Sequence, residues 1–143
     1  MVISKELDWV ESYIDSVKYL LPEIKKLKRI TSKVPSKKLN TNQSCHGIIT
    51  KYYNGKDHRI TLYTKYLLME LKKGEVHITI EKYSKIDTLC FLAHELAHLR
   101  YWDHTPDHKE LETTITASFM KMLRKDGYNN EEDEDSYWEP CRK

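Results

Sequence analysis

The segment His94-Glu95-Leu96-Ala97-His98 constrains this chain most strongly, because it places two histidines four residues apart within an apolar run. On an α-helix, residues four apart lie about 40° apart around the axis, so both imidazoles face the same side. Glu95 lies about 100° away from His94, too far to bind a metal ion with the histidines but close enough to reach a metal-bound water. Two neutral nitrogen ligands and a carboxylate base are the minimum set for zinc-assisted hydrolysis.

The residues before and after the motif predict that it lies on a buried helix over 84–101. An apolar run precedes the first histidine, and Ser84 or Asp87 is a suitable N-cap. A glutamate buried on such a helix needs a partner, because burying an unpaired charge is costly. A metal-bound water would supply that partner for Glu95.

A third metal ligand is expected just after this helix. Pro106 disfavours helical geometry in the residue before it, so the first helix should end near Tyr101 or the next residue. The resulting turn lets His104 return to the metal. Two residues of the following helix, His108 and Glu112, remain alternative third ligands.

The stretch HELAHLRYWDHTPDHKEL is similar to the HELxHLxxxNHSxxF signature of the SprT-like, YgjP-like and WLM group of zinc metalloproteases, some of which act on DNA–protein crosslinks. The close match spans 18 residues, and a looser resemblance covers roughly 45–125. Asp103 replaces the family's asparagine, and His108 replaces its later aromatic residue. The resemblance implies a small zincin-like domain with Glu95 as the catalytic base. It also implies three ligands for one catalytic Zn2+ ion: His94, His98 and His104.

The same histidine spacing also matches the HGxLHLxGxDH motif of YbeY-type zinc endoribonucleases, which have glycine where this chain has Glu95. A carboxylate at that position is what a peptidase needs to take a proton from water and deliver it to the leaving amine. The sequence therefore favours a zinc metalloendopeptidase that hydrolyses a protein or peptide substrate. A YbeY-like ribonuclease and a nucleic-acid-associated adaptor with a structural zinc are the alternatives.

Composition is consistent with a small intracellular enzyme. The chain has 143 residues, of which 39% are hydrophobic, and this predicts one domain over 1–128. Its three cysteines are far apart, which is typical of reduced thiols. No long apolar run or apolar leader is present, so we expect a soluble monomer in the cytoplasm, or associated with a nucleoid or nucleus, and no membrane span.

Apolar spacing predicts an α+β fold with an N-terminal helix, about three antiparallel strands, the motif helix and a C-terminal helix. The expected N-terminal helix covers 5–21, a second segment runs from Pro22 to Ile30, and a loop covers 31–45. The expected strands are 47–53, 58–64 and 75–81, the C-terminal helix covers 106–126, and 66–71 is ambiguous. An exposed edge strand, either 58–64 or 75–81, would bind an extended peptide.

Charge is unevenly distributed, although the formal net charge is only +2. One run has no acidic residue and is a candidate DNA-binding surface or, equally, a solvated face: Lys25, Lys26, Lys28, Arg29, Lys33, Lys37 and Lys38. An acidic tail over 129–143 is expected to be flexible. Glu139 or Cys141 in this tail is a candidate blocker of the zinc.

Overall fold

The computed structural model describes residues 1–34, 47–51 and 57–127 and has an α+β fold, as predicted. Its α-helices are α1 (Glu11–Ser16), α2 (Lys85–Ala97) and α3 (Pro106–Lys125). Two short 3-10 helices, η1 (Lys5–Val10) and η2 (Pro22–Lys26), accompany them. The strands are β1 (Val2–Ile3), β2 (Leu27–Lys33), β3 (Gly47–Lys51), β4 (His58–Tyr63), β5 (Lys65–Lys72) and β6 (Glu75–Lys82).

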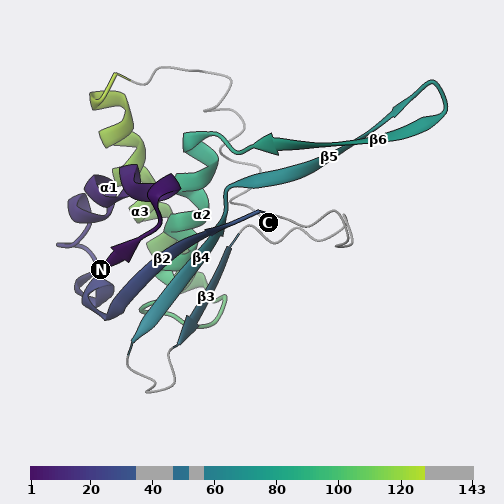
Figure 1. The fold of residues 1–143 in the computed structure, drawn as a ribbon. Coiled ribbons are helices and arrows are strands. Elements are labelled where there is room, and N and C mark those ends of the chain that lie inside the picture. The colour runs from purple at the N-terminus through teal and green to yellow at the C-terminus, as the bar shows by residue number, and fades with distance from the viewer. Residues whose placement is uncertain (35–46, 52–56, 128–143) are drawn as a thin grey trace.

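The strands form two sheets rather than the one antiparallel sheet predicted. Four strands make a mixed sheet in the order β1-β2-β4-β3, in which β2 runs parallel to both neighbours and β3 runs antiparallel to β4. Strands β5 and β6 make a separate antiparallel hairpin that projects from the body of the molecule (Figure 1). Because β4 is paired on both sides, the segment 58–64 is not an edge strand.

Strand β2 was not predicted, and its irregular register explains why. Its pairing with β4 shifts between Leu27 and Arg29, so the buried residues Leu27 and Ile30 are three positions apart. Together with buried Ile24, this spacing resembles one face of a helix. The sequence predicts a loop at Thr31, but in the structure Thr31 lies in β2 and pairs with Thr61 of β4.

The N-terminal segment buries the predicted face but is not one continuous helix. Leu7, Val10, Ile14, Val17 and Leu21 are all buried. The chain starts as η1, continues as α1, and leaves helical geometry at Val17. Pro22 partly explains why the helix does not extend to Leu21 as predicted, because a proline forces the residue before it out of the helical region.

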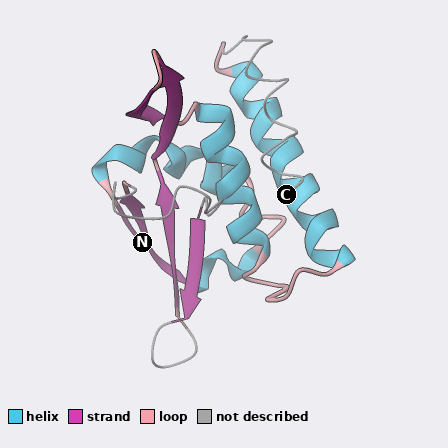
Figure 2. Ribbon diagram, turned by 90° about the vertical axis from the view of Figure 1, so that its right-hand side faces the viewer, coloured by secondary structure: helices cyan, strands magenta, loops and turns pink. Residues whose placement is uncertain are grey.

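Helix α2 lies between the four-stranded sheet and α3 (Figure 2). Its residues on both sides of the motif are buried in one apolar core that extends from η1 to α3. The motif therefore lies on a helix fixed by packing on two faces. No helix in the described ranges is long and apolar enough to cross a membrane.

The ends of α2 and α3 follow the sequence signals closely. The Ser84 side chain accepts a hydrogen bond from the Asp87 N–H at 3.1 Å, and the Thr105 side chain accepts one from the His108 N–H at 3.2 Å. These contacts satisfy amide groups that lack partners at a helix N-terminus. Gly127, with φ of 89°, follows the end of α3 in the left-handed conformation that glycine adopts readily. Helix α2 ends at Ala97, before the expected Tyr101.

Candidate metal centre

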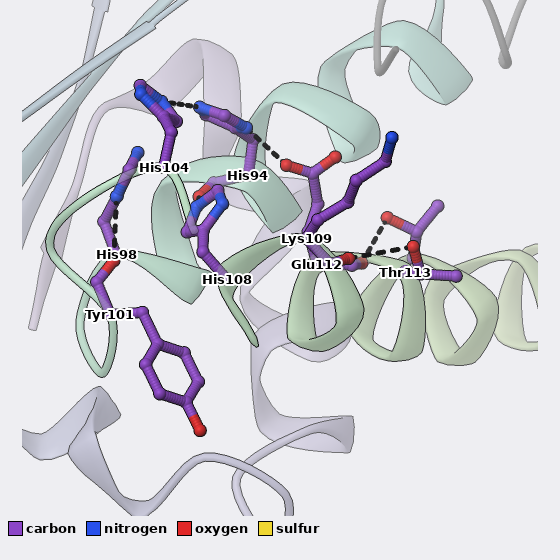
Figure 3. Close-up of polar contacts among 9 residues, drawn as sticks. His94, His98, Tyr101, His104, His108, Lys109, Glu112 and Thr113 are labelled. Carbon is purple, nitrogen blue, oxygen red and sulfur yellow. Dashed lines mark hydrogen bonds and ion pairs between the residues drawn. The ribbon is translucent and has the colours of Figure 1, made fainter. Parts of the chain in front are cut away.

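Four histidines from three consecutive segments gather at one end of α2. Helix α2 provides His94, its C-cap is His98, the loop before α3 provides His104, and α3 provides His108 (Figure 3). All six pairs of ring centroids lie between 4.0 and 5.4 Å apart. The turn after α2 therefore brings His104 back to the motif, as the sequence predicted.

Each of the two motif histidines has its Nδ1 bound by the protein, and the His94 Nε2 lies 3.1 Å from the His104 Nε2. The His94 Nδ1–H donates to the Glu112 carboxylate, and the His98 Nδ1–H donates to the carbonyl oxygen of Tyr101 at 3.0 Å. We infer these proton positions because both partners are acceptors. Each ring therefore keeps its Nε2 lone pair for a metal ion, and each outer partner fixes the orientation of its ring.

His108 is fixed in a different way. Its side chain is buried, and its Nε2–H donates to the carbonyl oxygen of His94 at 3.0 Å. Its ring stacks on that of His98, with centroids 4.0 Å apart and planes inclined by 27°. His108 therefore supports both motif histidines from α3 and keeps Nδ1 as its remaining nitrogen.

Three histidines, His94, His98 and His108, could hold a metal ion, because one ligand nitrogen of each lies within 4.8 Å of the others. The distances between the rings distinguish this set from the alternative set, in which His104 replaces His108. Nitrogens bound tetrahedrally to one zinc ion would lie about 3.3 Å apart, with ring centroids about 5 Å apart. In this set the closest rings are those of His98 and His108, whose centroids are 4.0 Å apart.

The alternative set matches those expected separations better. The Nε2 atoms of His94 and His104 are 3.1 Å apart, and the centroids of these rings are 5.1 Å apart. The His98 ring lies 4.9 Å from that of His94 and 4.7 Å from that of His104. The structure therefore brings both candidate third ligands, His104 and His108, to the motif histidines, and the centroid separations of the set with His104 are nearer to 5 Å. Glu112, the remaining alternative, is engaged in holding His94.

Burial keeps two of the histidines in the neutral form that binds metal. Desolvation, with a smaller contribution from the charges of the neighbouring histidines, lowers the pKa of His98 to about 4 against the opposing hydrogen bond to Tyr101. Desolvation also lowers the pKa of His108. For His94, desolvation lowers the pKa, but the hydrogen bond and charge of Glu112 outweigh it and raise the pKa above its ordinary value. Metal ligation requires neutral imidazole, so His98 is preorganised for it.

Glu95 is buried on α2 beside the histidines, with 6% of its surface exposed. Desolvation, aided by the charge of Glu112 and opposed by the charge of His94, raises the pKa of Glu95 to about 7. None of the ion pairs found in residues 1–34, 47–51 and 57–127 involves Glu95. A buried carboxylate with a pKa near neutrality is suited to proton transfer.

Five of the seven basic residues in the candidate DNA-binding run are described, and all five are exposed: Lys25, Lys26, Lys28, Arg29 and Lys33. Lys28 lies 4.0 Å from Asp57. Lys37 and Lys38 lie outside the described residues, as do Glu139 and Cys141 of the acidic tail.

Comparison with protein-family models, with curated proteins and with solved structures finds no match. The motif resemblance therefore stays a prediction, and the interpretation of the site rests on its own geometry.

Proposed function

We propose that this protein is a zinc-dependent metallopeptidase of the SprT/WLM-like type, with a zincin-like domain. His94, His98 and His104 are its ligands, and Glu95 is its base. One observation carries the proposal. The two motif histidines have their outer nitrogens held by acceptors, the Nε2 of His94 lies 3.1 Å from the Nε2 of His104, and the His98 and His104 ring centroids are 4.7 Å apart.

A bound zinc ion would polarise the scissile carbonyl and make the attacking water more acidic. Glu95 takes a proton from that water and delivers it to the departing amine. Its raised pKa suits both steps, because the group must accept and then release a proton near neutral pH. Glu112 holds His94 in the ligating tautomer throughout the reaction.

The carboxylate of Glu95 also supports a peptide rather than an RNA substrate. Peptide hydrolysis must protonate a poor amine leaving group, and Glu95 is a buried acid beside the ligands that is not hydrogen-bonded to one of them. An RNA substrate would place phosphate charges against a pair of carboxylates, Glu95 and Glu112. DNA-bound proteins are the more specific substrate class that the motif resemblance suggests. For that class, the exposed basic residues of η2 and β2 are the proposed DNA contact.

The test combines metal content with cleavage of casein, of DNA-bound protein and of RNA. Three proteins are compared: wild type, Glu95→Gln and the matched control Glu110→Gln. Glu110 is an exposed glutamate of α3, so its substitution should leave both metal content and cleavage unchanged. We expect one zinc per chain in all three proteins and a loss of protein cleavage of at least about 100-fold only in Glu95→Gln.

Other outcomes favour the alternative functions. Zinc-dependent RNA cleavage that survives Glu95→Gln would favour a YbeY-like ribonuclease. Stoichiometric zinc without any cleavage, held by four protein ligands, would favour an adaptor with a structural zinc. Failure of the wild type to retain zinc would reject the proposal.

A further inference from the structure

The loop after α2 supports the metal centre through a backbone atom. The carbonyl oxygen of Tyr101 accepts the hydrogen bond from the His98 Nδ1–H at 3.0 Å, while the Tyr101 ring points away from the histidines (Figure 3). The Tyr101 N–H donates to the carbonyl oxygen of Ala97 at 3.0 Å, which ties this residue to the end of α2. A carbonyl oxygen moves with its planar peptide group. Whatever holds this loop in place therefore also holds the His98 ring.

Arg100, the residue before Tyr101, anchors the loop to a distant part of the chain. Its Nε donates to one carboxylate oxygen of Glu23 at 2.5 Å, and an Nη donates to the other at 3.2 Å. The same Nη donates to the carbonyl oxygen of Leu20 at 3.0 Å. Isolated ion pairs at a surface contribute little, but a two-pronged arginine–carboxylate pair has a fixed geometry, and here a third bond reinforces it. The three bonds together define one position of the Arg100 side chain.

Both acceptors belong to the N-terminal segment. Leu20 lies between α1 and η2, and Glu23 lies in η2. Glu23 is half-buried, and its hydrogen bond with Arg100 lowers the pKa of its carboxyl below the ordinary value, so this acceptor is charged at neutral pH. The nearby Leu21 and Ile24 are buried in the core. The segment to which Arg100 binds is therefore itself fixed by packing.

We propose that Arg100 is a positioning residue for the metal centre. By holding the loop against Glu23 and Leu20, it fixes the Tyr101 carbonyl oxygen and, through it, the ligating orientation of His98. This inference rests on the proposed function, in which His98 is a metal ligand. Hydrogen-bond partners of ligating histidines set ring orientation and metal affinity although they do not touch the ion. Arg100 acts one step further from the metal, because the partner of His98 is a backbone atom.

His94 provides an internal comparison, because its support comes from a different element. The acceptor of its Nδ1–H is Glu112 of α3, whereas the bonds of Arg100 lead to the N-terminal segment. Loss of the Arg100 anchor should therefore weaken the Nδ1–H bond of His98 and leave that of His94 intact. A residue that only stabilised the fold as a whole would affect both rings alike.

The test measures, by NMR spectroscopy of the zinc-loaded protein, how fast the two ring Nδ1–H protons exchange with solvent. In Arg100→Ala, the His98 proton should exchange at least several-fold faster than in the wild type, whereas the His94 proton should exchange at the wild-type rate. Zinc affinity, measured by competition with a chromophoric chelator, should fall by about 10-fold. Arg100→Lys keeps the charge but loses the two-pronged geometry, so both of its values should be intermediate.

The matched control is Lys18→Ala, which removes an exposed ion pair with Asp15, at 2.7 Å, from the same N-terminal segment. Its exchange rates and its zinc affinity should equal those of the wild type. If Arg100→Ala does not fold, Glu23→Gln weakens the same anchor from the other side and should give the same selective change at His98.

A His98 exchange rate or a zinc affinity that stays at the wild-type value in Arg100→Ala would overturn the inference and leave the proposed metallopeptidase standing. Equal acceleration at His94 and His98 would also overturn it, because that result would show a general loosening of the fold. A wild type that binds no zinc would reject the proposed function and this inference together.

Discussion

Glu112 connects α3 to the first motif histidine, and its carboxylate is the only charged acceptor found on a histidine of the cluster in the described chain. Glu112→Gln should therefore weaken zinc binding by about 10- to 100-fold without removing any proposed ligand. The amide offers His94 a weaker, uncharged acceptor, so the ligating tautomer is held less firmly. Competition with a chromophoric chelator measures the zinc affinity directly.

Glu110→Gln is the matched control, because it makes the same chemical change two residues away on the exposed side of α3. Equal zinc affinities for the two variants would show that the contact between Glu112 and His94 does not support metal binding.

At the residue scale, the sequence identified the clustered histidines better than the groups that accept hydrogen bonds from their rings. The spacing of His94 and His98 reveals a shared helix face without any tertiary information. Their outer partners come from Glu112, 18 residues after His94, and from the backbone carbonyl of Tyr101. A carbonyl oxygen has no sequence signature, and Glu112 had been considered only as a ligand. To predict that α3 supports His94 in this way, one would need to know how α2 and α3 pack against each other.

Thr105 acts at the scale of an element, because it caps the helix that carries both Glu112 and His108. Thr105→Ala should lower the free energy of unfolding by about 1 kcal/mol, since the His108 amide loses its acceptor. Urea denaturation of the zinc-free protein measures this loss. Ser84→Ala, which removes the equivalent cap from α2, should cost a similar amount. No loss in either variant would contradict the role assigned to the caps.

Tyr13 links α1 to the end of α3, because its hydroxyl donates to Asp126 at 3.0 Å. Burial, together with the hydrogen bond to Asp126 and its charge, raises the pKa of Tyr13 to about 12. The folded state thus favours the neutral phenol. Its contribution to stability is complete below pH 10, the ordinary pKa, and is lost as the pH rises through about 12.

Tyr13→Phe tests this link through the pH dependence of unfolding. The variant should be less stable than the wild type by about 1 kcal/mol at neutral pH, because it loses one hydrogen bond. The gap should narrow, and then reverse, above pH 10, since phenylalanine has no proton to lose. Denaturant titrations from pH 7 to pH 12 measure the gap. A gap that stays constant across that range would contradict the raised pKa.

Helices and strands whose apolar residues follow one consistent spacing were predicted well, and those whose spacing is mixed were not. The caps of α2 and α3 and the strands β3, β4 and β6 follow local rules of capping, alternation and turn chemistry. In β2 the register shift gives a strand the spacing of a helix. The Tyr66–Leu71 segment is continuously apolar at its start, so periodicity does not separate strand from helix there.

At the scale of the whole molecule, the site couples α2, the following loop and α3, so metal binding should stabilise the fold. Zinc at 100 times its dissociation constant should add about 2.7 kcal/mol, or roughly 8 °C in the melting temperature. A chelator should reverse the shift. The double variant His94→Ala/His98→Ala should melt at the same temperature with and without zinc. A wild-type melting temperature that does not change when zinc is added would contradict this coupling.

The α+β class was predictable, but the arrangement of its sheets was not. The sheet order β1-β2-β4-β3 joins the first residues of the chain to strands more than 20 residues later. Such pairings depend on tertiary packing rather than on neighbouring residues. The separation of β5 and β6 into a projecting hairpin also has no local signal, because an exposed apolar strand and a buried one have the same alternation.

The most direct test of the central claim is X-ray absorption spectroscopy of the zinc-loaded protein. Three imidazole nitrogens at about 2.0–2.1 Å and one additional light ligand are expected. His104→Ala should reduce the imidazole count to two, and His108→Phe, which preserves ring stacking, should leave it at three. A zinc ion with fewer than three imidazoles in the wild type, or an imidazole count unaffected by His104→Ala, would contradict the proposed centre.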